Sequence, residues 1–126
     1  MVTRRIFIIL FIAVMLVASV LAIRQCAIRN SNAMACIGNL RQIEAGKDQY
    51  ALENGKSNGW AWAADEEAFL ELAAAVYMKG YPVCRASSMY NINIPRSAKH
   101  AAASYRVNPI GVKPVCKVAP KLHLLP

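Results

Sequence analysis

The first feature of the chain is a long, uninterrupted apolar run at its start. Residues 6–22 contain no charged residue, no glycine and no proline. As a helix this run is about 25 Å long, the short end for a hydrocarbon core of about 30 Å. Ile23 and the aliphatic stems of Arg5 and Arg24 can extend it. We therefore predict a membrane anchor over residues 6–23.

The same run can also be interpreted as a secretory signal peptide. Val20-Leu21-Ala22 satisfies the small-residue rule for cleavage after Ala22. The run is longer than the usual signal core of about 7–15 residues, which favours an uncleaved anchor. Arg4 and Arg5 precede the run, and by the positive-inside rule they favour a cytoplasmic location for residues 1–5. Both interpretations place residues 24–126 outside the cytoplasm.

After the apolar run the pattern changes to a one-sided helical stripe. Its members recur at steps of three or four residues, with the stem of Lys47 lying along the stripe. They are Cys36, Leu40, Ile43, Lys47, Tyr50 and Ala51. Asn54-Gly55 is a good helix end. We predict that the first helix continues over residues 24–54 and that residues 55–126 form a small extracytoplasmic α+β domain.

Within residues 55–126 the pattern predicts one more helix and three short strands. The helix covers residues 64–79, with a stripe that includes Phe69, Leu72 and Val76, and Gly80 ends it. The strand candidates are residues 90–94, 105–107 and 115–118. Residues 96–104 are interpreted as a loop or one helical turn. The expected fold class is α+β, with a small antiparallel meander at the C-terminus.

Composition narrows the possible classes of protein. With 126 residues the chain holds one small domain at most, which excludes a multi-domain enzyme. The single apolar run excludes a polytopic transporter. A hydrophobic content of 56% is too high for a disordered chain, and the net charge of +8 excludes an acidic solvating protein.

Several short motifs, in order along the chain, resemble a known family. Residues 35–45 (ACIGNLRQIEA) resemble the CxNNLRQI segment of pilin-like or pseudopilin proteins from the bacterial group that includes Verrucomicrobia and Planctomycetes. Residues 50–54 and 62–70 are similar to the two segments that follow this motif in the same proteins. Residues 82–84, 105–116 and 123–126 resemble its P-x-C, its closing Asn-Pro region and its H-x-LP tail.

The resemblance implies a pilin-like fold and a role in assembly. The expected protein is a single-pass component of the bacterial inner membrane, with its C-terminal domain in the periplasm. Its partners would be the membrane and other pilin-like subunits, contacted through the N-terminal helix of a type II secretion or type IV pilus-like system. The chain departs from pilins in lacking a glycine before the apolar run and a glutamate inside it.

The four cysteines are Cys26, Cys36, Cys84 and Cys116. On one helix Cys26 and Cys36 are about 15 Å apart, too far for a bridge. Cys84 and Cys116 bracket the strand region, and disulfides persist outside the cytoplasm. We therefore predict a Cys84–Cys116 disulfide and a buried, apolar role for Cys36. The absence of C-x-x-C and of a histidine at zinc spacing predicts no metal and no cofactor.

The sequence holds no recognisable catalytic constellation. His100 and His123 are the only histidines, and the first turn of a helix explains the acidic cluster of residues 65–67. Nucleophile-elbow, Walker and zinc-protease motifs are absent from the sequence. We therefore predict an interaction protein and not an enzyme.

The C-terminal part of the chain is strongly basic. From Gly80 onward it has no Asp or Glu, and its seven bases are Arg85, Arg96, Lys99, Arg106, Lys113, Lys117 and Lys121. They form either a solvated face or a surface for an anionic polymer or lipid. In this basic part of the chain only two tyrosines could stack on nucleic-acid bases, which is too few for sequence-specific recognition. The alternative function is thus a non-enzymatic periplasmic binding module, secreted or anchored.

Overall fold

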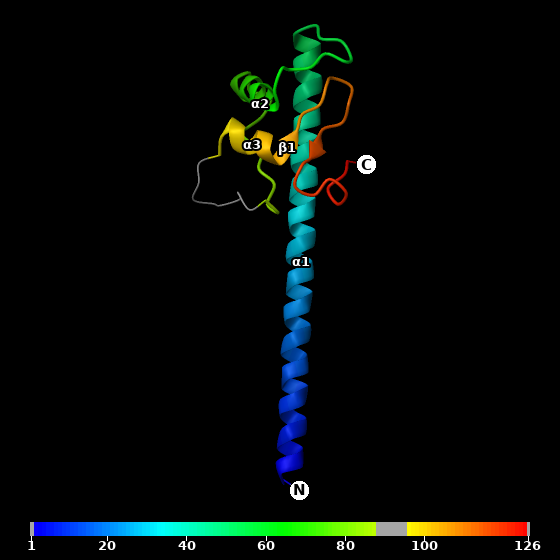
Figure 1. The fold of residues 1–126 in the computed structure, drawn as a ribbon, viewed down its shortest axis with the longest axis vertical. Helices are drawn as coiled ribbons and strands as arrows, with labels where there is room; N and C mark the ends of the chain where they lie inside the picture. The colour runs from blue at the N-terminus through cyan, green and yellow to red at the C-terminus, as the bar shows by residue number, and fades with distance from the viewer. Residues whose placement is uncertain (1, 88–95, 126) are drawn as a thin grey trace. The chain divides into compact units, whose positions relative to one another are not determined.

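The computed structural model describes residues 2–87 and 96–125 and divides the chain into two compact units, Met1–Ser31 and Asn32–Pro126. Helix α1 spans Val2–Glu53 and therefore contributes residues to both units (Figure 1). The apolar helix continues as predicted past residue 24, and it ends at Glu53, one residue before the predicted end at residue 54.

In the first unit the apolar side chains of α1 are exposed. All residues from Ile6 to Ile23 are exposed, among them Phe7 at 72% and Phe11 at 67%. Apolar surface of this extent is unfavourable in water. By length and composition, this part of α1 can cross a membrane or act as a signal sequence.

In the second unit one face of α1 forms the floor of the core. Cys36, Leu40 and Ile43 are fully buried, and Lys47 is 2% exposed. The predicted stripe is therefore confirmed from Cys36 to Lys47, because the 3.6-residue period brings these positions to one side of the helix. Its last two members, Tyr50 and Ala51, are half-buried. The core that covers this face also includes Ala68, Phe69, Leu72, Met78, Cys84, Ala98, Ala101, Tyr105, Val107 and Cys116.

The ammonium of Lys47 is enclosed by one loop of the second unit. Its Nζ donates hydrogen bonds to the carbonyl oxygens of Val107 (2.9 Å), Pro109 (2.9 Å) and Val112 (2.6 Å). These three acceptors match the three protons of the ammonium group. Burial lowers the pKa of Lys47, and the carboxylates of Asp48 and Glu44 act in the opposite direction. Lys47 thus attaches the 107–112 loop to α1.

Helix α2 spans Asp65–Ala74 and is shorter than predicted. The expected end at residue 79 is wrong, because the chain turns at Val76, whose φ is +61°. The Val76 side chain is 80% exposed, whereas Phe69 and Leu72 of the predicted stripe are fully buried. The alanine-rich sequence continues the helical pattern to residue 79, but the helix ends at Ala74, well before Gly80.

We expect Val76→Gly to stabilise the second unit by about 1 kcal/mol. A β-branched residue in the left-handed region costs about 1–2 kcal/mol of backbone strain, which glycine relieves. Glycine also raises the conformational entropy of the unfolded chain, and this offsets part of the gain in stability. The exposed valine side chain contributes little packing. Urea unfolding followed by circular dichroism measures the change, and Val112→Gly, at another exposed valine, is the comparison. An equal or lower midpoint for Val76→Gly would contradict the expectation.

The remaining elements are one short helix and a two-stranded sheet. Helix α3 spans Ala98–Ser104 and is capped by Ser97, whose side chain accepts a hydrogen bond from the His100 amide. Residues 96–104 were predicted as a loop or one helical turn, and the observed helix is longer than one turn. Strands β1 (Tyr105–Arg106) and β2 (Val115–Cys116) pair antiparallel, with Tyr105 opposite Cys116. The strand predicted over residues 90–94 lies outside the described residues.

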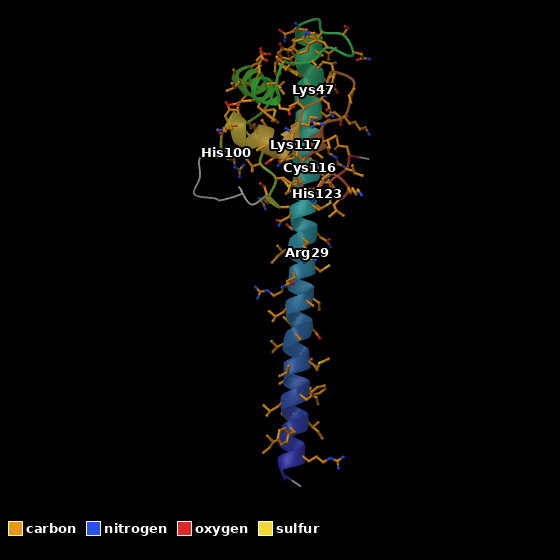
Figure 2. The ribbon with its side chains drawn as sticks, in the orientation of Figure 1. Arg29, Lys47, His100, Cys116, Lys117 and His123 are labelled. Carbon is orange, nitrogen blue, oxygen red and sulfur yellow. A yellow bond between two sulfur atoms is a disulfide. The ribbon has the colours of Figure 1, made fainter. Side chains whose placement is uncertain are left out.

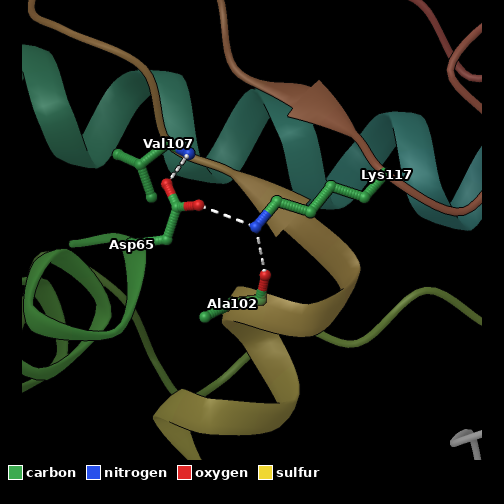
Figure 3. A network of polar contacts seen from close by, with 4 residues as sticks. All are labelled: Asp65, Ala102, Val107 and Lys117. Carbon is green, nitrogen blue, oxygen red and sulfur yellow. Dashed lines mark hydrogen bonds and ion pairs between the residues drawn. The ribbon is translucent and has the colours of Figure 1, made fainter.

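A polar network connects α2, α3 and the ends of both strands (Figure 3). Asp65 Oδ1 accepts from the Val107 amide at 2.8 Å, and Oδ2 accepts from Lys117 Nζ at 2.7 Å. Lys117 Nζ also donates to the Ala102 carbonyl at 2.6 Å. Asp65 therefore does more than complement the dipole of α2, because it fixes that helix to the sheet.

Candidate functional site

Three cysteines and one histidine meet in the core of the second unit. Cys36 comes from α1, Cys84 from the segment after α2, Cys116 from β2 and His123 from the C-terminal tail. Their donor atoms, the three Sγ atoms and one imidazole nitrogen, all lie within 4.8 Å of one another. We call these four residues the Cys/His cluster.

The Cys/His cluster is closed to solvent. All three cysteines are fully buried and His123 is 4% exposed. His123 Nδ1 lies 3.4 Å from Cys116 Sγ and 3.7 Å from Cys84 Sγ. Cys116 and His123 are labelled beside α1 in Figure 2. The imidazole therefore points its Nδ1 at the sulfur atoms.

The predicted disulfide is wrong in its pairing. The structure joins Cys84 to Cys36, with a Cα–Cα distance of 5.3 Å, and leaves Cys116 as a free, buried cysteine. Cys36 is buried as expected, but it is a bonding partner as well as an apolar residue. The sequence pattern places Cys36 on a helix, but it does not show which segment that face of the helix contacts. The pairing was therefore predicted wrongly.

Asn39 holds the segments that carry two of the cysteines. Its Nδ2 donates to the Tyr105 hydroxyl at 2.9 Å and to the Val83 carbonyl at 3.4 Å. Val83 precedes Cys84, and Tyr105 is paired with Cys116 across the sheet. One amide on α1 thus fixes both segments one turn away from Cys36.

A turn in the tail brings His123 to the same place. The His123 amide donates to the Ala119 carbonyl at 3.0 Å, and the Leu122 amide donates to the same oxygen at 3.2 Å. Burial lowers the pKa of His123, which favours the neutral imidazole. Burial raises the pKa of Tyr105 to about 12, so its hydroxyl stays protonated at neutral pH. The surroundings of the cluster are therefore neutral hydrogen-bonding groups.

A cluster of this composition supports two kinds of chemistry. Thiols and a neutral imidazole are ligands for a soft or borderline metal ion. A free thiol beside a disulfide can also exchange with it. The cluster has no short ligand spacing in the sequence, because its four ligands come from four separate segments. The seven-residue step from Cys116 to His123 was the one local signal.

His100, the other histidine, has a local role in α3. The Ser97 hydroxyl lies 3.0 Å from His100 Nδ1. Among the described residues, His100 is not part of the Cys/His cluster. This contact belongs to the start of the helix, and it adds nothing to a catalytic site.

The seven C-terminal bases are all exposed but do not share one setting. Arg106 and Lys117 line one pocket with Pro120, and Arg96 lines another with Lys79. Lys117 is bound to Asp65, so it serves the fold as well as the surface. The structure thus brings Arg106 and Lys117 together and places Arg96 in a different pocket.

Neither a protein-family model, nor a curated protein, nor a solved structure matches this chain. Its function is therefore inferred from its own residues and their arrangement.

Proposed function

We propose that the chain is a membrane-anchored, pilin-like assembly protein of the bacterial inner membrane. In this proposal residues 6–23 cross the membrane and pack with like helices, and the second unit lies in the periplasm. The sequence resemblance supports a role in a type II secretion or type IV pilus-like system. The protein has no enzymatic activity in this proposal.

The observation that carries the proposal is the dual character of α1. Over residues 6–23 every side chain is exposed and nearly all are apolar, whereas over residues 36–47 one face is the floor of a core. A helix that served only as a folding scaffold would not need the first part. Lipid or neighbouring apolar helices would remove that surface from water.

Membrane attachment is tested by placing a charge in the apolar part of α1. An arginine at the centre of a membrane helix costs about 2.5–3.5 kcal/mol on insertion scales. We expect Val14→Arg to move a large fraction of the chain from the alkali-washed membrane pellet to the soluble or aggregated fraction. Leu52→Arg, at a residue of the second unit that is 81% exposed, is the matched control and should stay in the membrane.

Intact mass of the membrane-extracted chain separates the anchor from the signal peptide. An anchor predicts that residues 1–22 are retained. A soluble periplasmic chain that starts at Ile23 would refute the proposal, because it lacks the helix through which subunits are expected to pack.

Assembly is tested with Cys26, which is free and exposed on α1. If subunits pack through α1, a short bismaleimide should join two copies through Cys26 in native membranes. Cys26→Ser should abolish the dimer band. Adding Ser57→Cys to that variant, at an exposed loop position, should restore little of it. Equal cross-linking at both positions would indicate random collision and contradict assembly through the helix.

The alternative, a basic binding module, rests on the exposure of all seven C-terminal bases. It predicts that the detergent-solubilised chain binds heparin and random duplex DNA alike at low salt. If three bases contact phosphates, the slope of log K against log salt should be about −2 to −3. Arg106→Gln should reduce this slope. Binding that is absent at low salt, or indifferent to salt, returns these residues to a solvated face.

A further inference from the structure

We propose that the chain in its reduced form binds one Zn²⁺ ion through the sulfur atoms of Cys36, Cys84 and Cys116 and through Nδ1 of His123. This Cys₃His site would be structural, and it would join α1, the segment after α2, strand β2 and the tail. The inference does not depend on the proposed assembly function.

The distances around His123 match those of a tetrahedral zinc site. Zn–S bonds of about 2.3 Å and a Zn–N bond of about 2.0–2.1 Å place bound sulfur and nitrogen about 3.5 Å apart. In the structure Nδ1 lies 3.4 Å from the Cys116 sulfur and 3.7 Å from the Cys84 sulfur. All four donor atoms lie within 4.8 Å of one another, so once the Cys36–Cys84 bond is reduced, modest shifts of the sulfur atoms bring all four to zinc-bonding distance.

The donor set selects for zinc and for a closed site. Thiolate and imidazole ligands suit Zn²⁺, whereas Mg²⁺ and Ca²⁺ require oxygen ligands. Four protein ligands fill a tetrahedral shell and leave no position for a substrate. The burial of all four residues agrees with this, since the most exposed of them, His123, is only 4% exposed.

Cys116 and His123 are the residues that a disulfide alone does not explain. The Cys36–Cys84 bond already links α1 to the segment after α2. The buried free thiol of Cys116 and the imidazole of His123 lie against the same sulfur atoms, but neither adds a covalent link to this bond. As the third and fourth ligands of an ion, however, both have a defined role.

The disulfide form and the zinc form exclude each other. A phosphine reductant breaks the S–S bond by donating an electron pair, takes up an oxygen atom from water and leaves two thiols. Zn²⁺ then displaces the protons of three thiols. Oxidation by glutathione disulfide reverses this: two thiolates form the protein disulfide, two glutathione thiolates leave, and the ion loses two of its four ligands.

The test uses the full chain in detergent, reduced with a phosphine under nitrogen and then freed of metal. We expect it to take up about one Zn²⁺ per chain, measured by elemental analysis after gel filtration. Co²⁺ should give the strong visible absorption of a tetrahedral, thiolate-bound ion, and Zn²⁺ should abolish it. Oxidation with glutathione disulfide should release the metal in step with the loss of two thiols.

Four variants assign the ligands. Cys116→Ser should weaken Zn²⁺ binding by more than about 100-fold, since losing even an outer partner of a ligand costs 10–100-fold. Its oxidised form keeps the Cys36–Cys84 bond, so its folding can be checked by circular dichroism. His123→Ala should also weaken binding, and His123→Cys should restore it with a changed Co²⁺ spectrum. Cys26→Ser is the control, because Cys26 is exposed and should not affect binding.

Two results would overturn the proposal. The first is a reduced, folded wild-type chain that retains less than half an equivalent of Zn²⁺ after gel filtration. The second is a Cys116→Ser variant that binds Zn²⁺ as tightly as the wild type. Either result would leave Cys116 and His123 as packed residues beside a structural disulfide.

Discussion

Replacing Lys47 by methionine is expected to destabilise the second unit by about 3 kcal/mol. Methionine preserves most of the volume of the side chain but removes the ammonium group that binds the carbonyl oxygens of Val107, Pro109 and Val112. A hydrogen bond to a charged group contributes about 1.5–3 kcal/mol, and a buried acceptor without a partner costs about 1–3 kcal/mol. Partial access of water to two of the acceptors limits the total.

Chemical unfolding of the detergent-solubilised chain measures this effect, with fluorescence of the two tryptophans as the probe. Lys121→Met is the matched control, because Lys121 is exposed and such substitutions change stability by less than about 0.5 kcal/mol. Hydrogen exchange of the 107–112 amides should also accelerate in Lys47→Met. If both variants unfold at the same denaturant concentration, Lys47 does not hold the loop.

The second large effect is expected from the Cys36–Cys84 bond. In the oxidised, metal-free chain, Cys36→Ala should lower the stability of the second unit by about 4 kcal/mol. The bond closes a loop with a sequence separation of 48 residues, and the chain-entropy relation gives this value for such a loop. For a unit of this size the melting temperature should fall by more than about 15 °C.

The same experiment distinguishes the two possible pairings of Cys84. With the observed pairing, Cys36→Ala lowers the melting temperature strongly and Cys116→Ala lowers it only through lost packing. A Cys84–Cys116 bond would reverse this order. Measurements in the presence of a chelator keep any bound metal from contributing, and Cys26→Ala should leave the melting temperature unchanged.

Features that depend on local pattern were predictable from the sequence. The stripe from Cys36 to Lys47 is confirmed, because the period of a helix alone brings these side chains to one face. The exposure of the apolar run over residues 6–23 agrees with a helix that crosses a membrane or acts as a signal sequence. The end of α2 was not predictable in this way, because the helical pattern continues through Val76 while the backbone turns there.

The Cys/His cluster lay beyond local pattern. Its assembly depends on which segments α1 faces, and that depends on polar contacts such as Asn39 with Tyr105, whose members are 66 residues apart. Sequence spacing gives no measure of such proximity. The pairing of Cys84 was predicted wrongly for the same reason, and His123 was given no role beyond its place in the H-x-LP tail.

The polar contacts of α1 also have a consequence for the order of folding. Asn39 and Lys47 each bind partners at least 44 residues further along the chain, and the disulfide of Cys36 spans 48. Helices form within about a microsecond, whereas contacts that close long loops form slowly. We therefore expect α1 to form completely before residues 55–126 pack against its C-terminal part. Under the proposed function, residues 6–23 then enter the membrane while residues 55–126 are still unfolded.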